Sequence, residues 1–399
     1  MSQDVIVPRF ARFRSTIFTE MTELARRTGA INLGQGFPDS DGPPELLAAA
    51  AEAILAGHNQ YPPLPGVPEL RAAVARQRAE DYGTPYDPAT EILVTAGATE
   101  ALAATIAALV PDGDEVVVFE PYYDSYAAAV ALAGARLVTV RLRPVDGRFT
   151  FDPAELAAAV TGRTRMLLVN TPHNPTGTVL SAAELAEIAR LCQRHDLLAV
   201  TDEVYELLVY DGVPHVPLAS LPGMAERTLT VSSAGKTFNA TGWKVGWVCG
   251  PAPLVAAVRT VKQYLTFAGG TPFQYAVAAA LPDRHAWAAT LRGRLVAARD
   301  TLKGELDGAG WRTFACQGTY FLQADARSVG YADGTELCQD LATGAGVVAI
   351  PSSAFYADPA GGRELIRFAF CKAQAVIETA AGRLAGFAAA RRQPEGVSR

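Results

Sequence analysis

The chain contains 399 residues, of which 49% are hydrophobic and 19% charged, and its formal net charge at pH 7 is −6. This length predicts roughly two or three domains, and the composition excludes a disordered or fibrous protein. The acidic balance argues against binding to nucleic acid or to an anionic membrane. Arginine cannot give up its proton in a protein whereas lysine can, so the lysines are the candidate amine nucleophiles. There are only five of them: Lys236, Lys244, Lys262, Lys303 and Lys372.

The cysteine and histidine patterns predict a protein without metal in a reducing compartment. The five cysteines are odd in number and widely spaced, which is unlike a disulfide framework or a zinc site, and the five histidines show no ligand spacing. Residues 1–14 lack the apolar core of a signal peptide, and the uncharged stretch 263–282 is interrupted by glycine and proline. We therefore predict a cytoplasmic protein with no metal and no membrane partner.

Residues 1–30 have a helical pattern but are too few to form a domain, so we expect them to pack against the C-terminal part or a partner chain. The chain then alternates short apolar runs with alanine-rich helical segments such as 100–110 and 182–195, the latter with a capping box formed by Ser181 and Glu184. This alternation predicts an α/β domain with a mostly parallel, buried sheet. The expected strands are Glu91–Thr95, Glu115–Phe119, Arg136–Val140, Met166–Asn170, Leu197–Asp202, Thr228–Ser232 and Val245–Cys249.

The pattern changes after Pro282. A long arginine-rich helix is expected over 284–306, hairpin-like runs around 319–323 and 364–370, and a closing helix from about residue 374. These elements predict a smaller α+β domain. We therefore expect an N-terminal arm over residues 1–44, a large domain over 45–290 and a small C-terminal domain over 291–399.

One candidate motif is the segment Ser232–Thr237, whose Gly-Lys-Thr looks like the end of a phosphate-binding P-loop. The full motif needs a glycine where this chain has Thr230. The segment Leu197–Glu203 looks like a Walker B strand, but it precedes the supposed P-loop, the reverse of the usual order. An NTPase interpretation therefore requires two exceptions.

The same two segments satisfy, without exceptions, the requirements of a pyridoxal 5′-phosphate site. That cofactor is an electron sink only while its ring nitrogen is protonated, and a buried carboxylate such as Asp202 would keep it so. Its aldehyde must be held as a Schiff base by a lysine that later moves a proton, and Lys236 is the candidate. Ser233 and Lys244 would flank the phosphate.

Two further segments fit this interpretation. The turn Asn170–Gly177 is too rich in proline and glycine for a helix, and Asn174 on it could bond the cofactor's phenolate oxygen together with Tyr205. The segment Thr95–Glu100 leads from a strand through glycine into a helix, whose free N–H groups would bind a phosphate.

These motifs resemble those of class I/II aminotransferases of fold type I. The similarity is carried by Asn-Pro-Thr-Gly at 174–177, Thr-Asp-Glu-Val-Tyr at 201–205 and Ser-Ser-Ala-Gly-Lys-Thr-Phe-x-x-x-Gly-Trp-Lys at 232–244. The opening motif at 32–39 and the segment at 119–124 are similar to the kynurenine aminotransferase/glutamine transaminase K branch.

Within that branch the chain is similar to actinobacterial N-succinyldiaminopimelate aminotransferases, particularly over 32–44 and 262–274, and the whole resemblance runs from about residue 10 to 385. It implies a large domain with a mostly parallel seven-stranded sheet, a smaller α+β domain, and a homodimer with shared active sites. The implied activity is ping-pong transfer of an amino group from an L-amino acid to a 2-oxo acid, with 2-oxoglutarate as the expected acceptor.

The resemblance also implies a role for each matching residue. Lys236 would form the Schiff base, Asp202 would pair with the ring nitrogen, and Arg367 would clamp the substrate α-carboxylate. The implied cofactor contacts are Tyr205 and Asn174 on the phenolate oxygen, Tyr123 stacked on the ring, Ala98, Thr99, Ser233 and Lys244 on the phosphate, and Tyr61 reaching the phosphate from the other subunit. The implied substrate contacts are Gly36, Asn174, Arg367, Phe18 and Phe267.

Three positions depart from the kynurenine enzymes. This chain has Thr99 in place of an aromatic residue, Phe18 in place of tryptophan and Ala268 in place of histidine. All three lie on the substrate side, so kynurenine is not the expected substrate. N-Succinyldiaminopimelate transamination and β-lyase chemistry on the same fold stay open as alternatives. A transcription regulator of this fold would need a DNA-binding domain, and only about 30 residues precede Asn32.

Overall fold

The computed structural model describes residues 6–13 and 15–392, and its centre is a seven-stranded sheet. The seven strands are those expected from the sequence, to within two residues at each end. Strands β3, β4, β7, β8 and β9 pair in parallel, whereas β10 runs antiparallel to its neighbours β2 and β9. Their order across the sheet is β2 (Ile92–Ala96), β10 (Val245–Cys249), β9 (Thr228–Ser233), β8 (Leu198–Asp202), β7 (Thr164–Asn170), β3 (Glu115–Glu120) and β4 (Arg136–Arg141).

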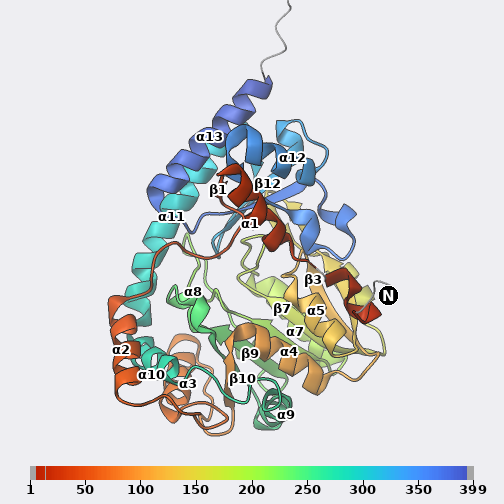
Figure 1. Cartoon of the computed structure of the whole chain (residues 1–399). Coiled ribbons are helices and arrows are strands. Elements are labelled where there is room, and N and C mark those ends of the chain that lie inside the picture. The colour runs from red at the N-terminus through yellow and green to blue at the C-terminus, as the bar shows by residue number, and fades with distance from the viewer. Residues whose placement is uncertain (1–5, 14, 393–399) are drawn as a thin grey trace, which may run out of the picture.

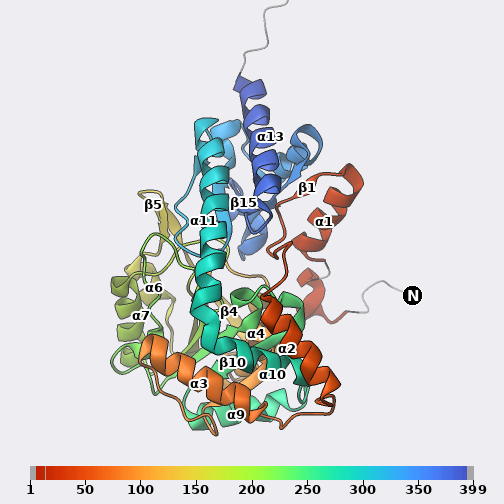
Figure 2. The same cartoon turned by 90° about the vertical axis from the view of Figure 1, so that its left-hand side faces the viewer.

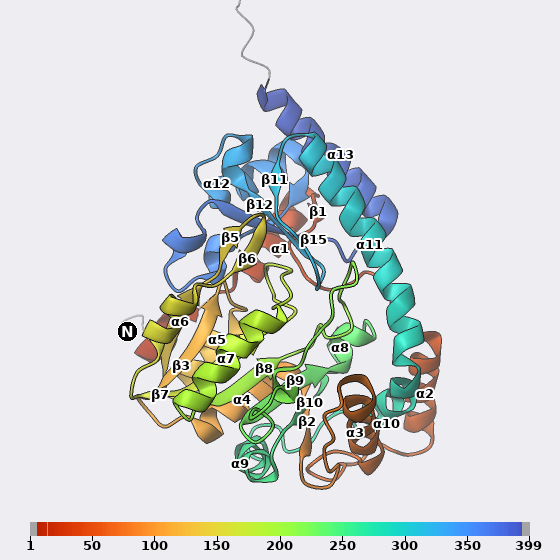
Figure 3. The ribbon, with the colours of Figure 1, turned by 180° about the vertical axis from the view of Figure 1, so that it is seen from behind.

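Both faces of this sheet are covered by helices. Successive side chains of a strand point to opposite faces, so neighbouring residues of one strand belong to different cores. Val116 and Val118 belong to the core beneath α4, α5 and α9, whereas Val117 belongs to the core beneath α6 and α7. Figure 3 shows α6 and α7 on the near face of the sheet, and Figure 1 shows α4 and α5 on the opposite face. The helices are α4 (Gly97–Leu109), α5 (Ser125–Leu132), α6 (Pro153–Ala159), α7 (Ala182–Arg194) and α9 (Ala252–Lys262).

The expected capping box begins α7. The Ser181 hydroxyl accepts from the Glu184 backbone N–H, and the Glu184 carboxylate accepts from the Ser181 N–H at 2.7 Å. Near this helix, a two-stranded ribbon is formed by β5 (Arg143–Val145) and β6 (Arg148–Thr150). A third helical layer packs on the β2–β10 edge around the buried Trp247, and it consists of α2 (Pro44–Leu55), α3 (Pro68–Tyr82) and α10 (Thr271–Ala280).

The C-terminal part forms a second sheet of four strands in the order β11-β12-β15-β14. The runs expected as hairpin-like are β12 and β15. Each pairs antiparallel with the short strand before it, β12 with β11 and β15 with β14, and they also pair with each other, Phe321 opposite Ala369, across a long connection. This connection contains α12 (Gly334–Asp340) and the single-turn helix Leu341–Ala345. The strands are β11 (Arg312–Thr313), β12 (Phe321–Asp325), β14 (Ile350–Pro351) and β15 (Leu365–Ala369).

One long helix, α11 (Arg284–Gly308), connects the two parts of the molecule. Figure 2 shows it running from the layer of α2, α3 and α10 up to the second sheet, where it lies beside α13 (Gln374–Arg392). Its first residue is fixed to α3, because the Arg284 guanidinium bonds Asp81 at 2.5 Å and Glu80 at 3.0 Å.

The N-terminal segment packs with the second part. Helix α1 (Ile17–Thr28) contributes Met21 and Ala25 to the core that also holds residues of α11 and α13, and β1 (Ile31–Asn32) pairs in parallel with β13 (Val347–Val348). We retain the division at residues 44 and 290 as a proposal, supported by these contacts; the ends of the arm and of the small domain fall partly outside the described residues. No helix in the described ranges is long and apolar enough to cross a membrane.

Candidate active site

The carboxyl ends of several strands meet at one edge of the central sheet, as expected of an α/β site. β8 ends at Asp202, β9 ends at Ser233, and β2 continues directly into α4 at Gly97. They border a cavity of about 310 Å³. Every residue predicted for the site lines this cavity except two; the lining residues are Phe18, Gly36, Ala98, Thr99, Tyr123, Asn174, Asp202, Tyr205, Ser233, Lys236, Lys244 and Arg367.

The two exceptions are Tyr61 and Phe267. Their side chains are 80% and 42% exposed, and they contact each other edge to face with ring centroids 5.4 Å apart. A single chain therefore does not bring them to its own cavity. They project together from the surface formed by the segment after α2 and the loop before α10.

Asp202 is a buried carboxylate that lacks an ion-pair partner among the described residues. One of its oxygens accepts from the Tyr126 hydroxyl at 2.6 Å and the other from the Val204 N–H at 3.3 Å. Burial raises the pKa of Asp202, and the bond from Tyr126 opposes that rise. A protonated ring nitrogen would supply the missing positive charge, so this carboxylate fits a pyridinium partner.

Lys236 lies on the single turn α8 (Ala234–Thr237), directly after β9. Its Nζ donates to the Tyr320 hydroxyl at 2.8 Å. Burial lowers the pKa of the Lys236 amine to about 8. A substantial fraction of this amine is therefore neutral near physiological pH, which both imine formation and proton transfer require.

A phosphate cradle lies at the N-terminus of α4. Gly97 adopts φ +75°, and a β-carbon built on it would lie 3.4 Å from Lys244 Nζ, so this ammonium group sits beside the start of the helix. A β-carbon on Gly246 would lie 2.6 Å from the Gly97 carbonyl carbon, so only glycine allows β10 to approach here. Free N–H groups at Ala98 and Thr99 together with a lysine make this a fitting site for an anion.

Arg367, on β15, is buried and points into the same cavity. Its guanidinium donates to Asn174 Oδ1 at 3.1 Å and to the Gly34 carbonyl at 2.8 Å, while its Nε has no partner. Three aromatic rings surround it, those of Phe321, Phe355 and Phe18, with centroids 4.0, 4.8 and 5.4 Å from Cζ. Burial lowers the pKa of Arg367 to about 10, so it remains a cation, and its free donor is available to a carboxylate.

The turn after β7 is tied to Asp202 by Asn170. The Asn170 side chain donates to the Asp202 carbonyl at 2.8 Å and accepts from the Asn174 N–H at 2.7 Å. Beside it, the Tyr205 ring is buried and packs edge to face on Tyr320 with centroids 5.3 Å apart. Asn174 and Tyr205 therefore reach the cavity from two segments that are fixed to each other.

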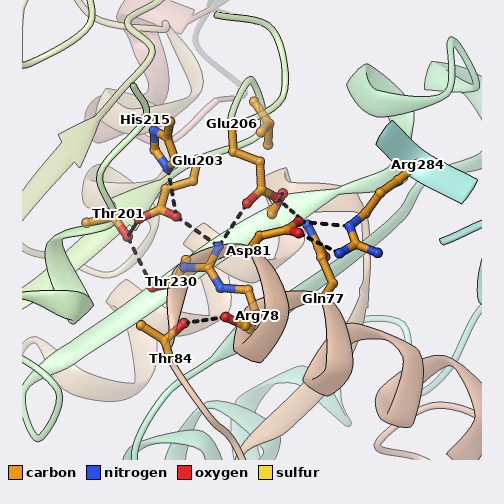
Figure 4. Close-up of polar contacts among 12 residues, drawn as sticks. Gln77, Arg78, Asp81, Thr84, Thr201, Glu203, Glu206, His215, Thr230 and Arg284 are labelled. Carbon is orange, nitrogen blue, oxygen red and sulfur yellow. Dashed lines mark hydrogen bonds and ion pairs between the residues drawn. The ribbon is translucent and has the colours of Figure 1, made fainter. Parts of the chain in front are cut away.

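Glu203, the residue after Asp202, belongs to a buried ionic cluster (Figure 4). The Arg78 guanidinium of α3 bonds Glu203 at 3.0 Å and Glu206 at 2.9 Å. His215 lies 3.2 Å from Glu203, and these two carboxylates and the imidazole are close enough together to ligate a metal. The Arg78 guanidinium already lies between the two carboxylates and supplies the positive charge that a metal ion would supply. Burial raises the pKa of the Glu203 carboxyl, but Arg78 and His215 outweigh burial and lower it to about 2. Glu203 is therefore ionised and pairs with Arg78.

Sequence reasoning missed three polar residues at this site, Tyr126, Asn170 and Tyr320. Tyr126 and Tyr320 lie in an apolar helix and next to a strand, where an aromatic side chain normally indicates core packing. Asn170 stands at a strand end before a turn, and that position was the one local signal of a polar role.

The model of the family "Aminotransferase class I and II" matches residues 28–384. The chain belongs to this family. Its strands, its small domain elements and its lysine-bearing turn after β9 are thus those of an aminotransferase, and the resemblance noted in the sequence motifs is confirmed.

Named relatives are similar over nearly the whole chain. A probable N-succinyldiaminopimelate aminotransferase from Mycobacterium tuberculosis is 54% identical, covering 95% of this chain and 97% of that protein. The methionine aminotransferase of Escherichia coli is 42% identical over 96% and 99%, and human kynurenine–oxoglutarate transaminase 1 is 38% identical over 90% and 93%. The solved structure of the N-succinyldiaminopimelate aminotransferase from M. tuberculosis superposes with a TM-score of 0.93, covering 96% of this chain and 100% of that one.

The protein is therefore a pyridoxal-phosphate-dependent aminotransferase of fold type I. The residues present fit this cofactor, because the cavity combines a buried carboxylate lacking an ion-pair partner, an amine of lowered pKa and a phosphate cradle. Amino-group transfer is favoured over the β-lyase and P-loop NTPase alternatives.

Proposed function

We propose that Lys236, Asp202 and Arg367 carry the amino-group transfer, with Arg367 holding the substrate α-carboxylate. The observation that carries this proposal is their convergence on one cavity from β8, β15 and the turn after β9. Cofactor and substrate would supply the partners that these groups lack. Asp202 lacks a cation, Arg367 Nε lacks an acceptor, and the Lys236 amine is readily deprotonated.

Bound pyridoxal phosphate supplies the electron sink that stabilises the carbanion formed when the substrate loses its α-proton. Arg367 orients the substrate through its α-carboxylate, and the three rings around it exclude water from that ion pair. The neutral Lys236 amine accepts the α-proton and returns it as a general acid. Asp202 holds the proton on the cofactor's ring nitrogen, and Tyr126 holds Asp202 in place.

The side-chain pocket favours an uncharged amino acid. Within the described residues, the cations that line the cavity are Lys236, Lys244 and Arg367, and each already has a role. The rest of the substrate side is formed by Phe18, Phe37 and other apolar or amide side chains. A side-chain carboxylate would be buried there without a partner, which is costly.

N-Succinyldiaminopimelate is a second candidate donor, favoured by the 54% identity to a probable aminotransferase of that name. Its distal carboxylates would have to bind cations outside the cavity lining, for example at its mouth. 2-Oxoglutarate stays the proposed acceptor for either donor, and its distal carboxylate would likewise have to bind a cation outside the cavity lining.

A donor panel separates these candidates. We expect leucine and methionine to exceed aspartate at least about tenfold in kcat/KM, because a missing polar partner costs at least that much. The measurement is the absorbance change of the bound cofactor in single-turnover half-reactions, with 2-oxoglutarate and the methionine 2-oxo acid compared as acceptors. If N-succinyldiaminopimelate exceeds methionine by a similar factor, the second candidate is correct. If aspartate is the best donor, the side-chain pocket offers a partner for a carboxylate and does not favour uncharged amino acids.

We further propose a homodimer in which Tyr61 serves the partner's cavity. The exposed apolar side chains on α2, on the segment after it and on the loop before α10 support it, because exposed apolar surface of this kind is typical of an interface. These side chains are Leu47, Ile54, Leu55, Tyr61, Tyr264, Leu265 and Phe267, and the rings of Tyr61 and Phe267 contact each other. The loop that bears Phe267 is held in place by Lys262, which donates to the Phe267 carbonyl, and by Thr266, which donates to Glu100 at 2.6 Å.

Complementation between two defective variants tests this arrangement. Tyr61→Ala should weaken cofactor binding about 10- to 100-fold through loss of a charge-assisted phosphate contact. Co-expressed Tyr61→Ala and Lys236→Ala chains should recover about one quarter of wild-type activity at limiting cofactor, because half of the dimers are mixed and each holds one intact site. If Tyr61 served its own chain, the mixture would show no recovery beyond the Tyr61→Ala homodimer.

A cytoplasmic location is likewise proposed. It is supported by the five cysteines, all of which are buried and unpaired.

A further inference from the structure

The residue that contacts the Lys236 amine, Tyr320, has no role in the mechanism derived above. It immediately precedes β12, and its side chain is 1% exposed. The ring is wedged between Tyr205 and Phe321, with centroids 5.3 and 4.9 Å away. A tyrosine hydroxyl so deeply buried requires hydrogen-bond partners, and both of its partners belong to the active site.

The direction of these two hydrogen bonds is fixed. The Tyr320 hydroxyl lies 2.6 Å from the Gly36 carbonyl oxygen, which can only accept, so the single hydroxyl proton is donated to Gly36. The hydroxyl oxygen must then accept from Lys236 Nζ, 2.8 Å away. The chain of bonds therefore runs from Lys236 through Tyr320 to Gly36.

This direction matters for a lysine that acts as a base. A neutral amine has two N–H groups and one lone pair, and only the lone pair can remove a proton. Because Tyr320 takes an N–H, the lone pair is left free to face the cavity. If the hydroxyl instead donated to Lys236, it would occupy the lone pair and block the base, and the Gly36 carbonyl prevents that.

We propose that Tyr320 is a further catalytic residue, whose hydroxyl holds the free Lys236 amine with its lone pair available to the substrate α-proton. This inference rests on the proposed role of Lys236.

The segment that orients Tyr320 also holds the carboxylate clamp. Gly34 accepts from Arg367 and Gly36 accepts from Tyr320, two residues apart on the bend that follows β1. The same short piece of backbone therefore holds Arg367, which binds the substrate, and Tyr320, which holds the Lys236 amine. Displacement of this stretch would disturb both the clamp and the base.

Tyr320→Phe tests the proposal, since it removes only the hydroxyl and keeps the ring packing. We expect the half-reaction with methionine to slow about tenfold, the size of one well-placed hydrogen bond to a catalytic group. With α-deuterated methionine, the isotope effect on this rate should rise, because proton transfer becomes more rate-limiting. Cofactor affinity should stay within about twofold of wild type, since the phosphate cradle is untouched.

Tyr331→Phe is the control, because it removes a partly buried tyrosine hydroxyl that bonds Asp340, and neither residue lines the cavity. It should leave the rate and the isotope effect unchanged. A loss of cofactor affinity in Tyr320→Phe with an unchanged isotope effect would overturn the proposal, because it would indicate a merely structural role. Trifluorotyrosine at position 320 is a second variant that keeps the ring and weakens the oxygen as an acceptor, and it should slow the half-reaction several-fold.

A second measurement uses the enzyme without cofactor. An acceptor bond stabilises the ammonium more than the neutral amine, so its loss should lower the pKa of Lys236. We expect the midpoint of Lys236 acetylation against pH, followed by mass spectrometry, to fall by about half a unit to one unit in Tyr320→Phe. An unchanged midpoint would contradict the bond. If Lys236→Ala itself stays active, the proposed function fails; if only Tyr320→Phe behaves as wild type, this inference alone fails.

Discussion

Replacing Lys236 by alanine should lower kcat for amino-group transfer at least about 10⁴-fold, because in the proposed mechanism this one side chain supplies both the imine nitrogen and the general base. Arginine cannot substitute for it, and within the described residues the other lysine of the cavity, Lys244, lies at the phosphate cradle. The measurements are the single-turnover absorbance change and the mass of the protein after borohydride reduction. Wild-type enzyme should carry reduced cofactor on Lys236, and the variant should carry none.

Lys303→Ala is the control for this experiment. Lys303 is partly exposed on α11 and pairs with Asp307, so its loss should leave both readouts unchanged. Retention of trappable cofactor by Lys236→Ala, or transamination at the wild-type rate, would show that the imine forms elsewhere.

Asp202→Asn should lower kcat about 10²- to 10⁴-fold, the expected cost of removing one partner from a buried ion pair. The amide keeps the shape and can still accept from Tyr126, which bonds Asp202 at 2.6 Å, but it carries no charge to hold a proton on the ring nitrogen. The measurement is the half-reaction rate at saturating cofactor. Binding itself should change little, because the phosphate cradle is a separate group of residues.

A cofactor analogue methylated on its ring nitrogen supplies the decisive comparison, since its positive charge cannot be lost. We expect it to restore part of the Asp202→Asn activity. Asp196→Asn is the control and should behave as wild type. Asp196 is exposed, and its φ of +51° is a conformation that asparagine also adopts readily. If the methylated analogue restores no activity to Asp202→Asn, then Asp202 does not act by keeping the cofactor's ring nitrogen positively charged.

The parts of the fold that could be predicted from sequence are those with a local cause. The central strands are apolar runs such as Val116–Val118, and a fully buried strand requires such a run whatever surrounds it. Asp202 and Lys236 were also predictable, because Asp202 ends a strand, Lys236 lies in the turn just after one, and the chemistry demands those residue types. The capping box of α7 is local as well, since Ser181 and Glu184 are three residues apart.

The parts that could not be predicted depend on contacts between distant residues. Tyr126 reaches Asp202 across 76 positions, and Lys236 reaches Tyr320 across 84. Neither tyrosine differs locally from one that fills a core. The pairing of β12 with β15 is also non-local, and the local pattern of the two hairpin-like runs does not indicate that they pair with each other.

The continuous helix α11 has a mechanical consequence. Its 25 residues form a rod about 37 Å long, anchored at Arg284 to the acidic end of α3 and embedded at its other end in the small domain. A pivot of about 5° at Arg284 would carry its far end about 3 Å. Rocking of the small domain, and of Arg367 with it, would therefore strain the Arg284–Asp81 pair together with the bonds that tie the middle of α11 to the large domain, from Arg292 to the Leu207 carbonyl and from Arg299 to Asp211.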